Sequence, residues 1–153
     1  GRFGFAKIEN MQLINEKLKK AIVPDFILQQ AYKMMGTPYL WGGNSTKGND
    51  CSGFTQTIFK ASGIQLPRDA RQQALEGVTI TPNKNWSNIH KGDLLFFGKE
   101  DRVTHVGISI GGKDFIHQGG KVAINSLDER SENFSPKRLE SFLFIKRIFN
   151  MSS

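Results

Sequence analysis

The chain has a single cysteine, Cys51, and its position along the sequence suits a reactive thiol. Cys51 follows a polar, glycine-rich loop over residues 41–50 and precedes an apolar helical pattern over residues 52–62. A thiol at a helix N-terminus faces unpaired N–H groups and the positive end of the helix dipole, which favour the thiolate. The same N–H groups can stabilise an oxyanion on an attacked carbonyl. A buried structural cysteine is the alternative, but the polar neighbours Asp50 and Ser52 favour a nucleophile.

A thiol nucleophile needs a base, and His105 is the first candidate. It lies in a run over residues 104–110 in which aliphatic side chains alternate with small or polar ones, as on a β-strand with one buried face. His105 shares its face with Gly107, which leaves space beside the imidazole ring. A histidine without a catalytic role on a half-exposed strand is the alternative interpretation.

His117 is the candidate for the third group, which would orient the base. It lies in the next strand pattern, after a turn that contains two glycines. A two-residue loop at this turn would place His117 on the face opposite His105. A three-residue loop over residues 111–113 pairs Ile110 with Asp114 and returns both histidines to one face. The catalytic hypothesis therefore predicts an odd loop length.

The thiol and the three histidines of the chain are a poor set of metal ligands. A catalytic zinc usually has three such ligands or a carboxylate partner, and no HExxH-like spacing is present in the sequence. One cysteine also excludes an internal disulfide framework. We therefore expect no metal and no cofactor.

The composition is that of one globular domain with a basic surface. The chain has 153 residues, of which 38% are hydrophobic and 23% charged, and its 21 Lys and Arg against 14 Asp and Glu give a net charge of +7. This surplus is either an ordinary basic surface or one that attracts an anionic polymer. Because the basic residues are scattered, we expect no nucleic acid partner. A bacterial wall is as anionic as a nucleic acid and is the other candidate for such a polymer. No apolar run in the sequence is long enough to cross a bilayer.

Helical patterns precede strand patterns along the chain. Pro24 and Asp25 predict a helix start with Asp25 as the N-cap, and shorter helical patterns follow over residues 52–62 and 69–75. The period then changes, and strands are predicted over residues 93–97, 104–110, 114–118 and 142–148. This order indicates an α+β fold.

Six short motifs, in order over residues 24–148, closely resemble the NlpC-type bacterial cell-wall cysteine peptidases. Each motif alone is a weak signal, but six in the same order with usable spacing are a strong one. They are PYLWGG from Pro38, DCSGF from Asp50, LPRD from Leu66, KGDLLFF from Lys91, HVGI from His105 and FIH from Phe115.

The resemblance implies a papain-like fold, with N-terminal helices packed on a mostly antiparallel β-sheet. It implies a catalytic triad of Cys51, His105 and His117, and peptidoglycan stem peptides as substrates, cut between γ-D-glutamate and a diamino acid. Tyr39 matches a family tyrosine beside the nucleophile, where its hydroxyl would serve the oxyanion or the substrate. A core aromatic residue is the alternative for Tyr39.

The resemblance also implies a set of substrate-binding residues. Asp50 and Ser52 match positions that bind the N-terminal amine of L-alanine in members that cut free stem peptides, and a carboxylate beside an ammonium is a favourable contact. Arg68 and Asp69 either contact the substrate or only shape the cleft. A serine follows this pair in some members, whereas Ala70 stands here. The predicted set is Asp50, Ser52, Arg68, Asp69 and Trp41.

For the whole chain, we expect residues 1–23 to be the tail of a preceding SH3-like module and its linker, and residues 24–153 to be the catalytic domain. We expect a monomer that prefers a free N-terminal L-alanine and acts outside the cytoplasm, with cytoplasmic recycling as the alternative. The rival functions are an amidase or an acyltransferase on the same triad, and an inactive wall-binding module.

Overall fold

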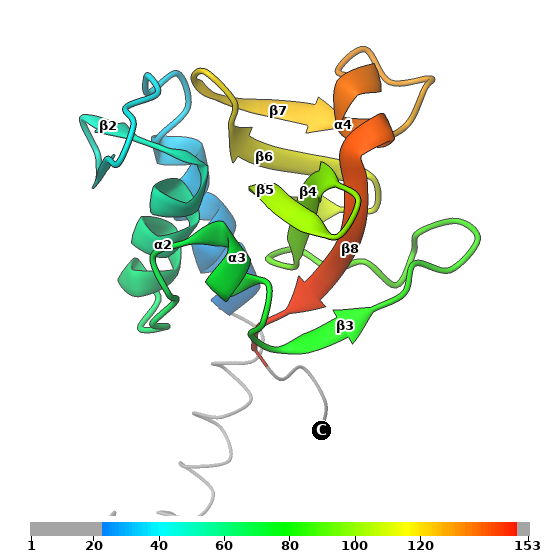
Figure 1. Ribbon diagram of the computed structural model, residues 1–153, viewed down its shortest axis with the longest axis horizontal. Helices are drawn as coiled ribbons and strands as arrows, with labels where there is room; N and C mark the ends of the chain where they lie inside the picture. Colours follow the sequence, from blue (N-terminus) through cyan, green and yellow to red (C-terminus); the bar gives the residue numbers. More distant parts are fainter. Residues whose placement is uncertain (1–22, 150–153) are drawn as a thin grey trace, which may run out of the picture.

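The helices that precede the sheet lie together on one side of it (Figure 1). The computed structural model describes residues 23–149, so the predicted SH3-like tail and linker lie almost wholly outside the described residues. Three helical segments come first: residues 23–33, α2 (Cys51–Ala61) and α3 (Ala70–Gln73). The predicted N-cap Asp25 is wrong, because residues 23–25 are already helical. Asp25 instead forms an ion pair with Lys91 at 3.2 Å.

The sheet has six strands, and every pairing between them is antiparallel. Their order across the sheet is β3-β8-β4-β5-β6-β7. With the three preceding helical segments on one side, this arrangement confirms the predicted α+β fold class. A short hairpin, β1 (Asn44–Ser45) with β2 (Gly48–Asn49), lies in the loop before α2. The strands of the sheet are β3 (Val78–Ile80), β4 (Leu94–Lys99), β5 (Arg102–Gly111), β6 (Asp114–Gln118), β7 (Val122–Ser126) and β8 (Phe142–Arg147).

Strand β4 is buried on both of its faces, which explains its unbroken apolar run. Leu94 and Phe96 pack into the core between the sheet and the helices, where Phe54 of α2 is also fully buried. Leu95 and Phe97 point the other way, into a second and smaller cluster. A central strand covered on both faces reads as a continuous hydrophobic run, not as an alternating one.

The hairpin of β5 and β6 has the register on which the catalytic hypothesis depends. Gly107 pairs with His117, as the predicted three-residue loop requires, and both candidate histidines lie on one face. The tip differs from the prediction, because Gly111 pairs with Asp114 and the turn between them is two residues long. Ile110 is the extra residue of a β-bulge, and this bulge restores the register that a two-residue turn alone would shift.

Besides the β1–β2 hairpin, which lies in the segment predicted to be a loop, three elements of the structure were not predicted from the sequence. They are β3, β7 and α4 (Pro136–Ser141), which begins after the N-cap Ser135 and precedes β8. Figure 1 shows α4 near β6 and β7, on the side of the molecule away from α2 and α3. Among the described residues, no helix is long and apolar enough to cross a membrane.

A buried ion pair joins β4 to β8. Asp93, which directly precedes β4, is completely buried and accepts hydrogen bonds from Nε and Nη2 of Arg147 at 2.8 and 2.7 Å. It also accepts a hydrogen bond from the backbone N–H of His90 at 2.9 Å. These contacts compensate for the burial of the carboxylate.

We predict that Asp93→Asn destabilises the domain by about 3 to 5 kcal/mol, because it leaves the Arg147 guanidinium buried without its counter-charge. The measurement is urea unfolding followed by circular dichroism. Asp128→Asn is the matched control, since Asp128 pairs with Arg130, whose side chain is 90% exposed. Equal and small effects of the two substitutions would contradict the prediction.

Candidate active site

Cys51 is the first residue of α2, as the sequence predicts, and its thiol is partly buried. Asp50 caps the helix by accepting a hydrogen bond from the backbone N–H of Gly53 at 2.7 Å. The preceding loop packs tightly on this first turn, because a Cβ at position 53 would lie 2.1 Å from the carbonyl oxygen of Gly43. Glycine is therefore required beside the nucleophile so that the loop can approach.

The carboxylate of Asp50 has a full set of partners within the protein. Nη1 and Nη2 of Arg68 donate to its two oxygens at 2.9 and 2.8 Å, and Gly42 N–H donates at 3.2 Å. Burial acts to raise the pKa of Asp50, but the hydrogen bonds from Arg68 and the backbone lower it on balance. Asp50 and Arg68 therefore fix the loop and the start of α2 as one ionised pair.

The two predicted histidines are buried and hydrogen-bonded to each other. His105 Nε2 lies 2.7 Å from His117 Nδ1, with the rings nearly perpendicular. His117 Nε2 lies 2.7 Å from Oδ1 of Asn125 on β7. Two successive hydrogen bonds thus link the side chains of His105, His117 and Asn125 in a row.

This row of hydrogen bonds determines which nitrogen of each imidazole ring carries a hydrogen. The Asn125 amide is oriented by its Nδ2, which donates to the carbonyl of Asn133 at 3.1 Å, so its Oδ1 accepts from His117. His117 Nε2 therefore carries a hydrogen, and its Nδ1 accepts one from Nε2 of His105. The unprotonated nitrogen of His105 is then Nδ1, which is the atom available to take a proton.

Both imidazoles are neutral at neutral pH. Burial and the nearby Arg138 cation lower the pKa of His105 well below its usual value. Burial lowers the pKa of His117 to about 4, although its bond to Asn125 acts in the opposite direction and Arg138 adds to the lowering. A neutral His105 has the free lone pair that a base needs.

The thiol of Cys51 is also neutral in the free protein. Burial and the Asp50 carboxylate raise its pKa, whereas the backbone N–H groups of Val106 and Ser52 and the Arg138 cation act to lower it. The helix terminus therefore does not by itself produce a thiolate here.

Seven of the nine predicted site residues line one groove of about 980 Å³. Trp41 is 86% exposed at its rim, and Tyr39 is 40% exposed. Burial, Cys51 and Asp50 raise the pKa of Tyr39, which keeps its hydroxyl protonated and able to donate. His105 and His117 are buried and do not line the groove, although Thr104, the neighbour of His105, does. The seven residues in the groove are Tyr39, Trp41, Asp50, Cys51, Ser52, Arg68 and Asp69.

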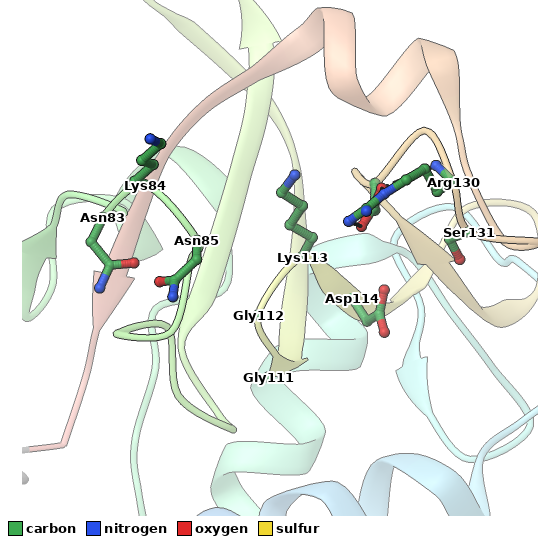
Figure 2. A pocket seen from close by; sticks show the side chains of 10 residues that line it. Asn83, Lys84, Asn85, Gly111, Gly112, Lys113, Asp114, Arg130 and Ser131 are labelled. Atoms are coloured by element: carbon green, nitrogen blue, oxygen red, sulfur yellow. Dashed lines mark hydrogen bonds and ion pairs between the residues drawn. The ribbon is translucent and has the colours of Figure 1, made fainter.

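A second hollow, of about 750 Å³, lies elsewhere, at the tip of the β5–β6 hairpin (Figure 2). Lys84, Lys113 and Arg130 surround it together with Asp114 and Asp128, so charges of both signs meet there. None of the predicted site residues lines it.

Two residues of the site were not predicted. Asn125 comes from β7, and Arg138 comes from α4, two of the elements that the sequence patterns missed. Within the described part of the chain, no three His, Cys, Asp or Glu side chains gather as metal ligands would.

Comparison with known proteins identifies the family. A model of the NlpC/P60 family matches residues 36–139, more than half of the chain. The chain is 37% identical over 133 residues to a gamma-D-glutamyl-L-lysine dipeptidyl-peptidase of Bacillus subtilis, covering 83% of this chain and 43% of that relative. It is 42% identical over 114 residues to a probable endopeptidase NlpC homolog of Haemophilus influenzae, covering 72% of this chain and 58% of the relative.

Solved structures agree with this result. An NlpC/P60 family protein from Bacillus cereus superposes with a TM-score of 0.70 at 34% identity, covering 82% of this chain and 40% of that one. The NlpC/p60 domain of the peptidoglycan hydrolase SagA gives a TM-score of 0.65 at 31% identity, covering 81% and 97%. Fold and site together define a papain-like cysteine peptidase domain. The chain belongs to the NlpC/P60 family.

We predict that the folded state loses stability between pH 7 and pH 5 because of its buried histidines. The pKa of His117 is about 4 in the folded state and 6.5 in the unfolded state. Between pH 7 and pH 5 the unfolded state therefore binds a proton at His117 that the folded state does not, which lowers the free energy of unfolding by about 2 kcal/mol. Urea unfolding at both pH values measures the loss, and His117→Gln should reduce it. His90→Gln is the control, because His90 is exposed. An equal loss in the wild type, His117→Gln and His90→Gln would contradict the assignment of the loss to His117.

Proposed function

We propose that this domain hydrolyses peptidoglycan stem peptides at the bond between γ-D-glutamate and a diamino acid. The proposal rests on one arrangement: Cys51 is the first residue of α2 and lines the groove, and α2 packs on the sheet that carries the hydrogen-bonded side chains of His105, His117 and Asn125. The names of the relatives supply the substrate class. Because the chain spans 43% and 28% of the first two curated relatives, the activity of the whole protein is part of the proposal.

In the proposed reaction, Nδ1 of His105 takes the thiol proton while the sulfur of Cys51 attacks the γ-glutamyl carbonyl. The backbone N–H of Cys51 and the hydroxyl of Tyr39 donate to the oxyanion. Protonated His105 then gives its proton to the diamino acid nitrogen, the C–N bond breaks and a thioester remains. His105 next deprotonates a water molecule, which attacks the thioester, and Cys51 leaves as the thiol with that proton.

His117 and Asn125 act in this scheme through His105. The bond from His105 Nε2–H to His117 Nδ1 fixes the orientation of the His105 ring and leaves its Nδ1 as the nitrogen that can take the thiol proton. When His105 becomes an imidazolium, the same bond becomes charge-assisted and stronger. The pair therefore favours the protonated base at the moment when it forms.

The N-terminal amine of the substrate is best received by Asp69. Asp50 is less suitable than the family resemblance implies, because Arg68 and backbone N–H groups already occupy its oxygens. Asp69 caps α3 through one bond to Arg71 N–H, is exposed and lines the same groove. Its free lone pairs can bind an ammonium, and this supports a preference for a free N-terminal L-alanine.

We propose that the protein acts outside the cytoplasm, because its named relatives include a peptidoglycan hydrolase, and that it acts as a monomer. The positive net charge of +7 is consistent with an anionic wall as the surrounding polymer.

We predict that Cys51→Ala abolishes hydrolysis of L-Ala-γ-D-Glu-L-Lys while thermal unfolding stays close to that of the wild type. The measurement is mass spectrometry of the products, which identifies the broken bond. Because Cys51 is the only thiol of the chain, alkylation by iodoacetamide should label the wild type once, and the variant not at all.

The products formed by the wild type also separate the rival reactions. Release of the intact stem peptide from a muropeptide would favour an amidase, and transfer of the acyl group to an added amine would favour an acyltransferase. Retained hydrolysis in the variant would refute the mechanism.

We predict that Asp69→Asn lowers kcat/KM for a tripeptide with a free amine by about 10-fold, since it removes a charge-assisted contact. It should have little effect on the N-acetylated tripeptide. Asp50→Asn is the matched comparison, because it breaks the pair with Arg68 and should slow both peptides alike. If Asp50→Asn slows only the peptide with a free amine and Asp69→Asn slows both peptides alike, Asp50 and not Asp69 binds the amine.

A further inference from the structure

Arg138 places a cation inside the active site from an element that the mechanism does not use. It lies on α4, and its Cζ atom is 5.7 Å from the centre of the Phe97 ring, which itself lies against His105. Its Nη2 lies 3.5 Å from the position that a Cβ on Gly119 would occupy, and that same position is 2.7 Å from Cε1 of His117. The guanidinium therefore lies beside the two histidines.

The charge of Arg138 reaches the reacting groups. It lowers the pKa values of His105 and His117, and it acts to lower that of Cys51. Burial lowers the pKa of Arg138 itself, whereas Cys51 raises it. A partly desolvated cation at this position gains from any anion that binds next to it.

Arg138 has no carboxylate partner among residues 23–149. Three other arginines in this part of the chain each form an ion pair with one carboxylate: Arg68 with Asp50, Arg130 with Asp128 and Arg147 with Asp93. The guanidinium of Arg138 instead lies over the aromatic face of Phe97. A guanidinium that is half-buried, unpaired within the described residues and close to the nucleophile is suited to bind a carboxylate from the substrate.

The position of Arg138 indicates which part of the substrate it meets. Asp69, the proposed amine partner, lines the groove together with Arg68, whereas Arg138 is absent from that lining. Figure 1 shows α3, which follows Asp69, and α4 on different sides of the molecule. The leaving group of a peptide lies on the other side of the scissile carbonyl from its amine end. Arg138 interacts with Cys51 but lies outside the lining that Asp69 shares, so we assign it to the leaving-group side of Cys51.

We propose that the Arg138 guanidinium binds a carboxylate of the diamino residue that leaves, and so selects for substrates that carry a free carboxylate there. This inference rests on the proposed function. The carboxylate has two possible sources: the α-carboxylate of a C-terminal diamino residue, and the side-chain carboxylate of diaminopimelate. Arg138 acts here as a specificity-determining residue, because it contacts the substrate away from the scissile bond.

The test compares L-Ala-γ-D-Glu-L-Lys as a C-terminal acid and as a C-terminal amide, with kcat/KM measured for wild type, Arg138→Gln and Arg138→Lys. We expect the wild type to prefer the acid by about 10-fold or more, Arg138→Gln to lose this preference, and Arg138→Lys to recover part of it. Arg130→Gln, on an exposed neighbouring loop, is the control and should keep the wild-type ratio. Because each ratio comes from one enzyme sample, partial misfolding of a variant does not affect it.

A second pair of substrates separates the two sources. The α-amide of the diaminopimelate tripeptide keeps its side-chain carboxylate, so a preference for it over the lysine amide that is lost in Arg138→Gln identifies the side-chain group. A wild-type ratio near one in both comparisons, or a ratio that Arg138→Gln leaves unchanged, would overturn the inference. If the wild type cleaves none of these peptides, the proposed function itself fails.

Discussion

The pairing of Gly107 with His117 across β5 and β6 is the constraint on which the site depends. Side chains alternate between the faces of a strand, so a slip of one residue would turn His117 away from His105 and break their 2.7 Å contact. The β-bulge at Ile110 sets this register, and β7 then brings Asn125 opposite Phe115, within reach of His117. The orientation of the base is therefore determined by backbone pairing at the far end of the hairpin.

Burial of the two histidines has an electrostatic consequence that the rest of the site accommodates. Both rings are held neutral and the thiol is held protonated, so the free enzyme lacks a preformed thiolate and imidazolium pair. Every buried side-chain nitrogen and oxygen among the described residues has a hydrogen-bond partner, which keeps the polar network from destabilising the core. In the proposed reaction, charge therefore develops as the substrate reacts, and the bond from His105 to His117 is already formed in the free protein.

Much of this arrangement was predictable from residue types and spacing. The start of α2 at Cys51, the α+β order and the shared face of the two histidines all follow from local patterns that match the structure. Strand β7 and helix α4 were missed because they are short and half-exposed, and their patterns carry little hydrophobic periodicity. Asn125 and Arg138 were missed with them, since their roles depend on contacts between distant segments. Ser135 followed by Pro136 was the one local signal that could have located α4.

Proximity to the nucleophile in the sequence does not determine whether a carboxylate has hydrogen-bonding positions left for a substrate. Asp50 adjoins the nucleophile, yet its oxygens are taken by Gly53, Gly42 and Arg68, and it serves the framework. A saturated carboxylate gains little from a further cation, because that cation must displace a partner that is already charged. Two side chains with spare hydrogen-bonding capacity lie farther along the sequence: Asp69, the N-cap of α3, and Arg138 on α4. The proposed division of roles is physically reasonable: groups that hold Cys51 rigid cannot also exchange partners with each substrate, so we assign recognition to Asp69 and Arg138.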